Sequence, residues 1–310
     1  MRRWTGCAGL LLLAASCLQG VVARAQEAEY VGEARCITCH EANNRHFTET
    51  PHARAFRGNP KNDLERRVCE ACHGPGSKHV ANAADKSAPI RFTRQSATPV
   101  ETMNAQCLQC HGGGQRQHWP GSAHAQNLVA CSDCHAPMER RSTDGLLRRP
   151  TINETCLACH AQQRAQFQKR SHMPVLEGKM SCVDCHNPHG SITRPLLRQD
   201  SVNETCVACH AEKRGPFLWE HAPVRENCAN CHDPHGSNHE RLLVSARPFL
   251  CQQCHNLPVG HSSAFYRGDQ TTAAALAGGT PSPRVIGRSC QNCHSAIHGS
   301  NHPSGARLQR

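Results

Sequence analysis

The chain has 310 residues and a formal net charge of +11, and it contains 22 Cys and 23 His but only 7 Phe, 3 Trp and 2 Tyr. So few aromatic side chains exclude an ordinary hydrophobic core, and something other than side chains must fill the interior. The basic residues are scattered singly along the chain, a pattern that argues against a nucleic-acid partner.

The N-terminal segment has the pattern of a secretory signal peptide. Two arginines precede an apolar run over residues 10–22, and the triplet ARA at 23–25 supplies small residues at the expected cleavage positions. The run is short for a membrane span. We therefore expect export to the periplasm, and removal of residues 1–25 would take away Cys7 and Cys17 and leave 20 of the 22 cysteines.

All 20 remaining cysteines belong to C-x-x-C pairs, and a histidine directly follows each pair. The ten pairs are Cys36 and Cys39, Cys69 and Cys72, Cys107 and Cys110, Cys131 and Cys134, Cys156 and Cys159, Cys182 and Cys185, Cys206 and Cys209, Cys228 and Cys231, Cys251 and Cys254, and Cys290 and Cys293. The histidines that follow them are His40, His73, His111, His135, His160, His186, His210, His232, His255 and His294. C-x-x-C-H is the attachment signature of c-type haem.

The spacing suits that chemistry, because two such thiols can each form a thioether to one porphyrin edge while the adjacent imidazole binds the iron as its proximal ligand. Zinc ribbons, redox dithiols and disulfide frameworks also use paired cysteines, but none of them requires a histidine next in line. The sequence therefore predicts ten c-type haems (haem c) and no catalytic residue. With so little polypeptide for each haem, the macrocycles must form the core.

The motifs recur in pairs at a period of about 50 residues, as the match between residues 151–167 and 201–217 shows. We expect five dihaem units, with motif pairs that begin at 36/69, 107/131, 156/182, 206/228 and 251/290. The expected domains are a signal peptide, 1–25, an N-terminal multihaem half, 26–150, with haems 1–4, and a C-terminal half, 151–310, with haems 5–10. The expected fold class is a multihaem c-type cytochrome, mostly irregular, with short α-helices, a haem-packed core and little or no β structure. Residues 155–170 are expected to form a few helical turns after a cap at Asn153 or Thr155.

Thirteen histidines remain after the proximal ones, so side chains could close every iron on both faces. Nine recur in register within the units and are candidate distal ligands: His52, His79, His124, His172, His189, His221, His235, His261 and His298. The second unit lacks one, because Met138 stands where the third unit has His189. For the fourth haem three interpretations stay open: Met138 as the sixth ligand, His118 as the sixth ligand with Met138 packed on the porphyrin edge, or an open site.

Three segments strongly resemble the periplasmic decahaem cytochromes of the MtrA/DmsE group. They read NETCVACHAEKRGPFLWEHAPVRENCANCHDPHGS (203–237), CQQCHNLPVGHSSAFY (251–266) and SCQNCHSAIHGSNHPSGARLQR (289–310). The likeness extends through all ten motifs. It implies a chain of bis-histidine haems, largely threaded through an outer-membrane β-barrel porin, that carries electrons between the periplasm and the cell exterior. The family has a histidine at the place of Met138, so this chain departs from it there.

The expected function is therefore electron transfer without substrate chemistry of its own. The expected partners are the porin, periplasmic or inner-membrane quinol-linked cytochromes, and an outer-surface multihaem cytochrome or extracellular iron. The alternative is a soluble periplasmic shuttle to a terminal reductase such as a DMSO reductase. A multihaem nitrite or hydroxylamine enzyme is disfavoured, because no C-x-x-C-K motif is present and Tyr30 and Tyr266 are the only tyrosines. The motifs do not encode the direction of electron flow.

Overall fold

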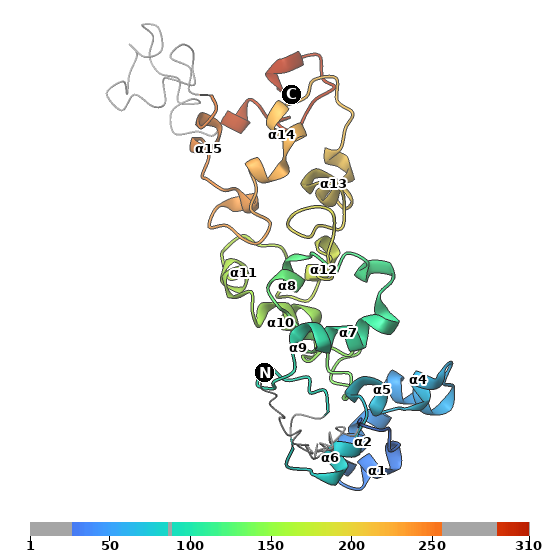
Figure 1. The fold of residues 1–310 in the computed structure, drawn as a ribbon. Coiled ribbons are helices and arrows are strands. Elements are labelled where there is room, and N and C mark those ends of the chain that lie inside the picture. The colour runs from blue at the N-terminus through green and yellow to red at the C-terminus, as the bar shows by residue number, and fades with distance from the viewer. Residues whose placement is uncertain (1–26, 86–88, 256–289, 310) are drawn as a thin grey trace, which may run out of the picture.

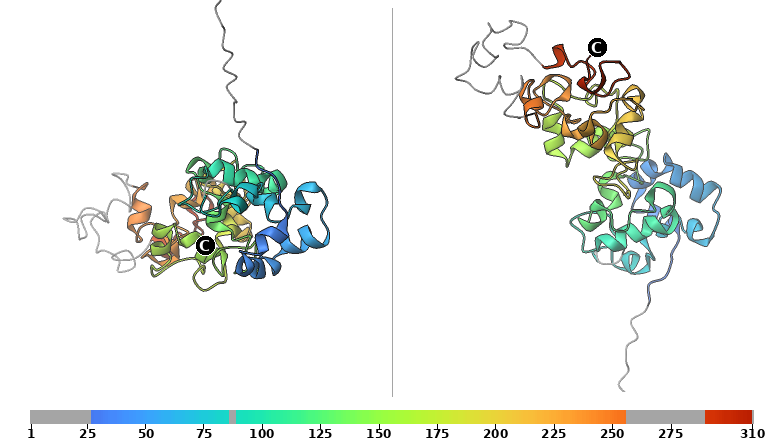
Figure 2. Two further views of the ribbon diagram at one scale, coloured as in Figure 1. Left: turned by 60° about the horizontal axis from the view of Figure 1, so that its bottom comes forward. Right: turned by 90° about the horizontal axis from the view of Figure 1, so that it is seen from above.

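The computed structural model describes residues 27–85, 89–255 and 290–309, so the expected signal peptide and His261 lie outside the described residues. The described part is elongated, and its repeated units follow one another in chain order along one axis (Figure 1). In the left view of Figure 2 the units overlap, because that view lies closer to the long axis. The motifs are thus arranged in a row.

The described residues form short helices joined by turns. The α-helices are α1 (Glu33–Ile37), α2 (Glu41–Thr48), α3 (Pro51–Ala53), α4 (Asp63–Arg66), α5 (Glu70–His73), α6 (Ser77–Ala81), α7 (Val100–His111), α8 (Ala123–Gln126), α9 (Cys131–Cys134), α10 (Ile152–Leu157), α11 (Ala161–Gln166), α12 (Cys182–Cys185), α13 (Val202–Val207), α14 (Ala222–Glu226) and α15 (Phe249–Gln252). A π-helical turn covers Arg54–Gly58, and 3-10 turns cover Gly114–Arg116, Ala211–Lys213, Cys228–Asn230, Glu240–Leu242, Cys290–Asn292 and Gly305–Arg307. Within these ranges β pairing is limited to isolated bridges, which confirms the expected mostly irregular, short-helical fold.

Helix α10 shows how the haem motifs begin. Thr151 caps it: the Oγ1 atom of Thr151 accepts a hydrogen bond from the Glu154 amide at 3.1 Å, and Glu154 Oε2 accepts one from the Thr151 amide at 3.1 Å. The expected cap at Asn153 or Thr155 was therefore wrong. The expected few helical turns form as two short helices, α10 and α11, because the backbone leaves the helical region at His160, with φ −82° and ψ 64°.

An asparagine three residues before the first motif of a unit joins that motif to the second one. The backbone amide of Cys131 donates to Asn104 Oδ1 at 2.8 Å, and Asn104 Nδ2 donates to the Val129 carbonyl at 3.1 Å. Asn153 and Asn203 bind the amides of Cys182 and Cys228 in the same way, at 3.0 and 2.7 Å. These asparagines, which our sequence interpretation missed as structural residues, fix the spacing of the two haem motifs in units two to four.

Replacing Asn104 with alanine should destabilise the haem-loaded protein by about 1–3 kcal/mol, because it leaves the Cys131 amide and the Val129 carbonyl without their partner. Asn127→Ala is the matched control, since the exposed Asn127 side chain only donates to the Ala123 carbonyl, at 2.8 Å. We expect a change within about 0.5 kcal/mol there. The midpoints of guanidinium unfolding compare the two variants, and equal midpoints would contradict the structural role of Asn104.

Apolar burial is sparse in the described residues. It is divided among small clusters, one of which contains Phe47, Ala53 and Val68 and another Leu157, Phe167 and Val175. A cysteine of a haem motif, Cys69 or Cys182, packs against each of these clusters. No helix in the described part of the chain is long and apolar enough to cross a membrane.

Candidate haem sites

The histidine of every second motif is oriented by a backbone carbonyl. Its Nδ1 atom donates to the carbonyl oxygen of a residue in the loop that follows the motif and folds back onto it. This leaves the Nε2 atom available to a metal. The pairs are His73 with Ile90 (2.8 Å), His135 with Gly145 (2.6 Å), His186 with Pro195 (3.0 Å), His232 with Arg241 (2.8 Å) and His294 with Arg307 (2.6 Å). The five units therefore present their second-motif imidazoles in the same way.

In the described residues seven imidazole pairs face one another, each composed of a motif histidine and a candidate distal histidine. The ring centres are separated by 6.2 Å in His40–His79, 5.9 Å in His111–His52, 6.1 Å in His160–His124, 6.1 Å in His135–His189, 6.1 Å in His186–His235, 6.1 Å in His255–His221 and 6.2 Å in His232–His298. The angle between the ring planes varies from 13° to 81°. The separation is therefore nearly constant while the tilt is not.

A nearly constant ring separation with a variable tilt fits a metal held between two imidazoles better than it fits direct ring stacking. An imidazole nitrogen binds a metal such as zinc at about 2.0–2.1 Å, and the ring centre lies about 1 Å behind it, so two rings that share an ion stand about 6 Å apart whatever their tilt. The adjacent cysteines are those that c-type haem requires. The residues present thus suit haem iron with an imidazole on each face.

Burial favours the neutral form of the distal rings. Desolvation is the main cause that lowers the pKa of these side chains below the ordinary histidine value, because a charged imidazolium is poorly tolerated away from water. The rings affected are His52, His189, His221, His235 and His298. A neutral imidazole keeps the lone pair with which it can bind a metal.

In six of the seven pairs the two histidines come from neighbouring units, whereas the sequence left open which motif each distal histidine faces. First-motif histidines face a histidine of the preceding unit, as in His111–His52, whereas second-motif histidines face one of the following unit, as in His135–His189. Among the described pairs, His40–His79, in the first unit, is the one that stays within its own unit.

The offset follows from how the turn after each second motif docks. In the third unit the turn that presents His189 reaches back to the second unit, where Asn187 Nδ2 donates to the Gln115 carbonyl at 3.1 Å. In the fourth unit Ser237 pairs with Ser171 of the third through two backbone hydrogen bonds of 2.7 and 3.0 Å. Each turn is therefore held against the unit before its own.

For the fourth motif we expected Met138, His118 or an open site opposite His135. The ring opposite His135 is that of His189. His118 is exposed, and its Nε2 lies 3.1 Å from the Gln117 amide nitrogen. Met138 packs elsewhere, against the cluster of Phe47, Ala53 and Val68.

His172 is not in an imidazole pair of this kind. Its Nε2 lies 2.9 Å from Glu177 Oε1 and its Nδ1 lies 2.7 Å from the Lys169 carbonyl. His210, the motif histidine of the next unit, has its Nδ1 at 3.8 Å from Glu212 Oε1. The structure thus leaves these two rings facing carboxylates.

Glycines allow the close approach of the turns. A side chain at Gly236, where φ is +148°, would place Cβ 2.0 Å from the Gln166 carbonyl oxygen, and one at Gly190 would place it 2.2 Å from that of His118. Both positions need a backbone conformation that favours glycine. The glycines that follow His189 and His235 are therefore part of these sites, which the sequence interpretation overlooked.

Gly236→Ala should push its turn away from the third unit and withdraw His235 from His186. We expect a high-spin ferric signal from one haem in the electron paramagnetic resonance (EPR) spectrum, since one iron loses a strong ligand. Gly113→Ala is the control, because a Cβ there meets no atom within 4 Å. A wholly low-spin spectrum from the folded Gly236 variant would show that the approach is not needed.

Comparisons with known proteins bear on the same motifs. A family model described as the doubled CXXCH motif matches residues 172–215 and 221–258, and one described as cytochrome c-type protein NrfB-like matches residues 69–147. Multiheme cytochrome MtrA of Shewanella baltica (strain OS185) is 43% identical over 279 residues, which are 90% of this chain and 81% of the relative. The chain belongs to the MtrA family of multihaem cytochromes.

Other relatives match less of the chain. Cytochrome c-type protein NrfB of Escherichia coli O6:H1 is 32% identical over 136 residues, 43% of this chain and 67% of the relative. C-type polyheme cytochrome OmcB of Geobacter sulfurreducens is 22% identical over 180 residues, 52% of this chain and 21% of the relative. Membership of the MtrA family confirms the resemblance seen in the sequence, and it identifies an electron-transfer protein that binds c-type haem.

Proposed function

We propose that this MtrA-family protein carries electrons across the outer membrane, between the periplasm and a donor or acceptor outside the cell, from within a β-barrel porin. The observation that carries the proposal is the series of imidazole pairs, which joins successive units along an elongated chain (Figure 1). Haem iron supplies reversible one-electron chemistry when bound. The polypeptide holds its sites in a fixed order.

We assign one haem to each of the ten C-x-x-C-H motifs, with the motif histidine as proximal ligand and the facing histidine as distal ligand. First-motif histidines face a histidine of the preceding unit, and by this rule His172 would be the distal ligand opposite His210. The contact between His172 and Glu177 would then have to break. His261 lies outside the described residues and stays the candidate for the last unit.

The pairs also argue against substrate chemistry. In each of the seven, side chains stand on both sides of the space where the iron would lie, so no face is left for nitrite, hydroxylamine or another substrate. We therefore propose a carrier and not an enzyme.

The place in the outer membrane rests on family resemblance and on dimensions. A bilayer with its headgroups is about 40 Å thick, so a single redox centre would not cross it but a row of haems would. A wide β-barrel can hold such a plug. The remaining proposed partners are quinol-linked cytochromes on the periplasmic side and an outer-surface cytochrome or extracellular iron on the other.

Co-purification and sealed vesicles test the conduit. The tagged haem-loaded protein should be recovered from outer-membrane fractions with a barrel protein. Vesicles that contain the pair should reduce an enclosed dye when an impermeant reductant is added outside, at a rate far above vesicles with the barrel alone. Recovery only from the soluble periplasm, without a barrel, would replace the conduit by a periplasmic shuttle.

A further inference from the structure

We infer that Met138 is the sixth ligand of the haem attached to Cys69 and Cys72, opposite His73, although it lies in the motif of a different haem. The inference rests on the proposed haem at each motif. It gives one haem near the α5 end of the row a histidine–methionine ligand set in place of two histidines.

Met138 occupies the same backbone turn as three distal histidines. Two backbone hydrogen bonds recur in these turns. In each turn, the amide of the residue after the candidate ligand donates to the carbonyl of the residue three positions before it. In units two to four, the amide of the residue two positions before the ligand also donates to a carbonyl of the loop that follows. The first set comprises Glu139 to Ala136 (3.0 Å), Gly190 to Asn187 (3.1 Å), Gly236 to Asp233 (3.2 Å) and Gly299 to Ala296 (3.0 Å). The second comprises Ala136 to Leu146 (2.6 Å), Asn187 to Leu196 (2.8 Å) and Asp233 to Leu242 (2.7 Å). The turn is therefore kept even though Glu139 replaces the glycine.

The turns point in a consistent direction. His189, His235 and His298 each face the second-motif histidine of the preceding unit. By the same rule Met138, in the second unit, should face His73, the second-motif histidine of the first unit. His135, in Met138's own motif, already has His189 opposite it.

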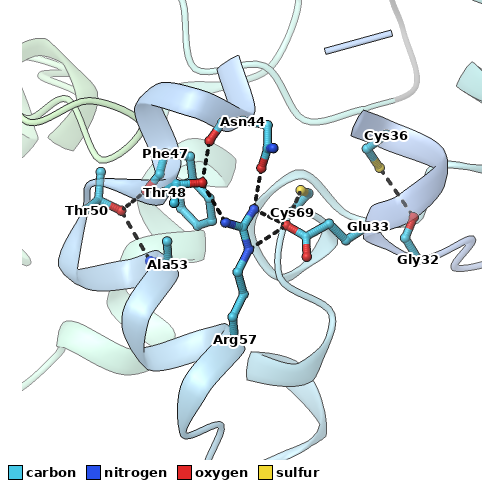
Figure 3. A network of polar contacts seen from close by, with 10 residues as sticks. All are labelled: Gly32, Glu33, Cys36, Asn44, Phe47, Thr48, Thr50, Ala53, Arg57 and Cys69. Carbon is cyan, nitrogen blue, oxygen red and sulfur yellow. Dashed lines mark hydrogen bonds and ion pairs between the residues drawn. The ribbon is translucent and has the colours of Figure 1, made fainter. Parts of the chain in front are cut away.

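Packing places Met138 beside the motif that the inference assigns to it. Met138 and Cys69 both pack against the cluster of Phe47, Ala53 and Val68. Figure 3 shows Phe47, Ala53 and Cys69 gathered around Arg57, whose guanidinium lies 5.3 Å from the centre of the Phe47 ring.

The third unit has the same arrangement around a distal histidine. Phe167 contacts His235 with the ring centres 5.6 Å apart, and Cys182 packs against the Phe167 cluster. Phe47 and Phe167 both stand seven residues after the histidine of a first motif. Met138 therefore packs against the cluster that contains Phe47, and His235 contacts Phe167 in the equivalent cluster.

The same register explains the two histidines that could compete. His118 also stands seven residues after a first-motif histidine, so it occupies the phenylalanine position and its backbone receives the turn at Gly190. His46 stands one residue before Phe47, as Gln166 stands before Phe167, and its side chain is exposed. Neither is in a turn that presents a distal ligand.

Spectroscopy of matched variants of the haem-loaded protein tests the inference. The ferric wild type should show the long-wavelength sulfur-to-iron charge-transfer band of histidine–methionine haem, and a redox titration should show one component above the rest. Met138→Leu should abolish both and let the ferrous protein bind one more equivalent of carbon monoxide. Met138→His should abolish both without the extra carbon monoxide, because an imidazole closes the site again.

Met173→Leu is the matched control, since Met173 packs against the equivalent cluster beside Cys182 and should leave band and titration unchanged. His46→Ala should also leave them unchanged. Absence of the band from the wild type, its survival in Met138→Leu, or extra carbon monoxide binding by His46→Ala would overturn the inference, while electron transfer in vesicles would still test the proposed function separately.

The assignment to the haem at Cys69 has its own test. The band should disappear when Cys69 and Cys72 are both replaced by alanine and persist when Cys131 and Cys134 are; the opposite result would return Met138 to its own motif. If these deletions do not fold, magnetic resonance of the ferrous protein serves instead. The strongly shifted methyl group of the ligated methionine should then show contacts with the Phe47 ring, and their absence would contradict the placement.

Discussion

A chain made without covalent haem attachment should remain unfolded. Only 14 apolar residues are buried in the described part of the chain, and two clusters of three residues each contain six of them. The α-helices there have 3 to 12 residues, and isolated helices shorter than about 12–15 residues are marginal in water. Ordering each residue costs about 1–2 kcal/mol of backbone entropy, which so little burial cannot offset.

Expression without the export signal, in a compartment that does not attach haem, provides the material for this test. Circular dichroism should show little helix and no cooperative thermal transition, and a protease should degrade the chain at once. The exported, haem-loaded protein is the control and should resist under the same conditions. A cooperative transition in the haem-free chain would mean that its side chains form a sufficient core after all.

His189→Ala should open the iron of the Cys131–Cys134 haem and not that of its own motif. The reason is the 6.1 Å separation between the rings of His189 and His135, while His186 keeps His235 at the same separation. The reduced variant should bind one more equivalent of carbon monoxide than the parent protein. His118→Ala is the matched control and should bind no extra carbon monoxide, because the exposed His118 ring lies beside Gln117.

Haem deletions locate the opened iron. In a background where Cys131 and Cys134 are alanine, His189→Ala should add no carbon monoxide binding. Where Cys182 and Cys185 are alanine, it should still add one equivalent. The reverse pattern would show that distal ligands stay within their own units.

Much of the fold could be predicted from the residues alone. Ten C-x-x-C-H motifs and the shortage of aromatic side chains indicate haem in place of a hydrophobic core, and the frequent Pro and Gly residues indicate short helices. The helix boundaries were harder, because Asn153 has the chemistry of a cap but is used to hold the Cys182 amide, and Thr151 caps α10 instead.

The pairing of histidines could not be predicted, because nearness in sequence does not determine which rings meet. His189 follows His186 by three residues, yet its turn is held against the preceding unit by long-range contacts such as that of Asn187 with Gln115. A signal was nevertheless present. In the turns after the second motifs, the glycine that follows the distal histidine marks a close approach of this turn to the preceding unit. The aromatic residue seven positions after a first-motif histidine marks the surface that the turn approaches.

A map of the haem-loaded protein at a resolution that distinguishes side chains would show whether distal ligands are exchanged between neighbouring units. We expect His189 on the far face of the haem held by His135, and the Met138 sulfur on the far face of the haem held by His73. His118 or Met138 opposite His135, with His189 returned to the haem of His186, would contradict this expectation.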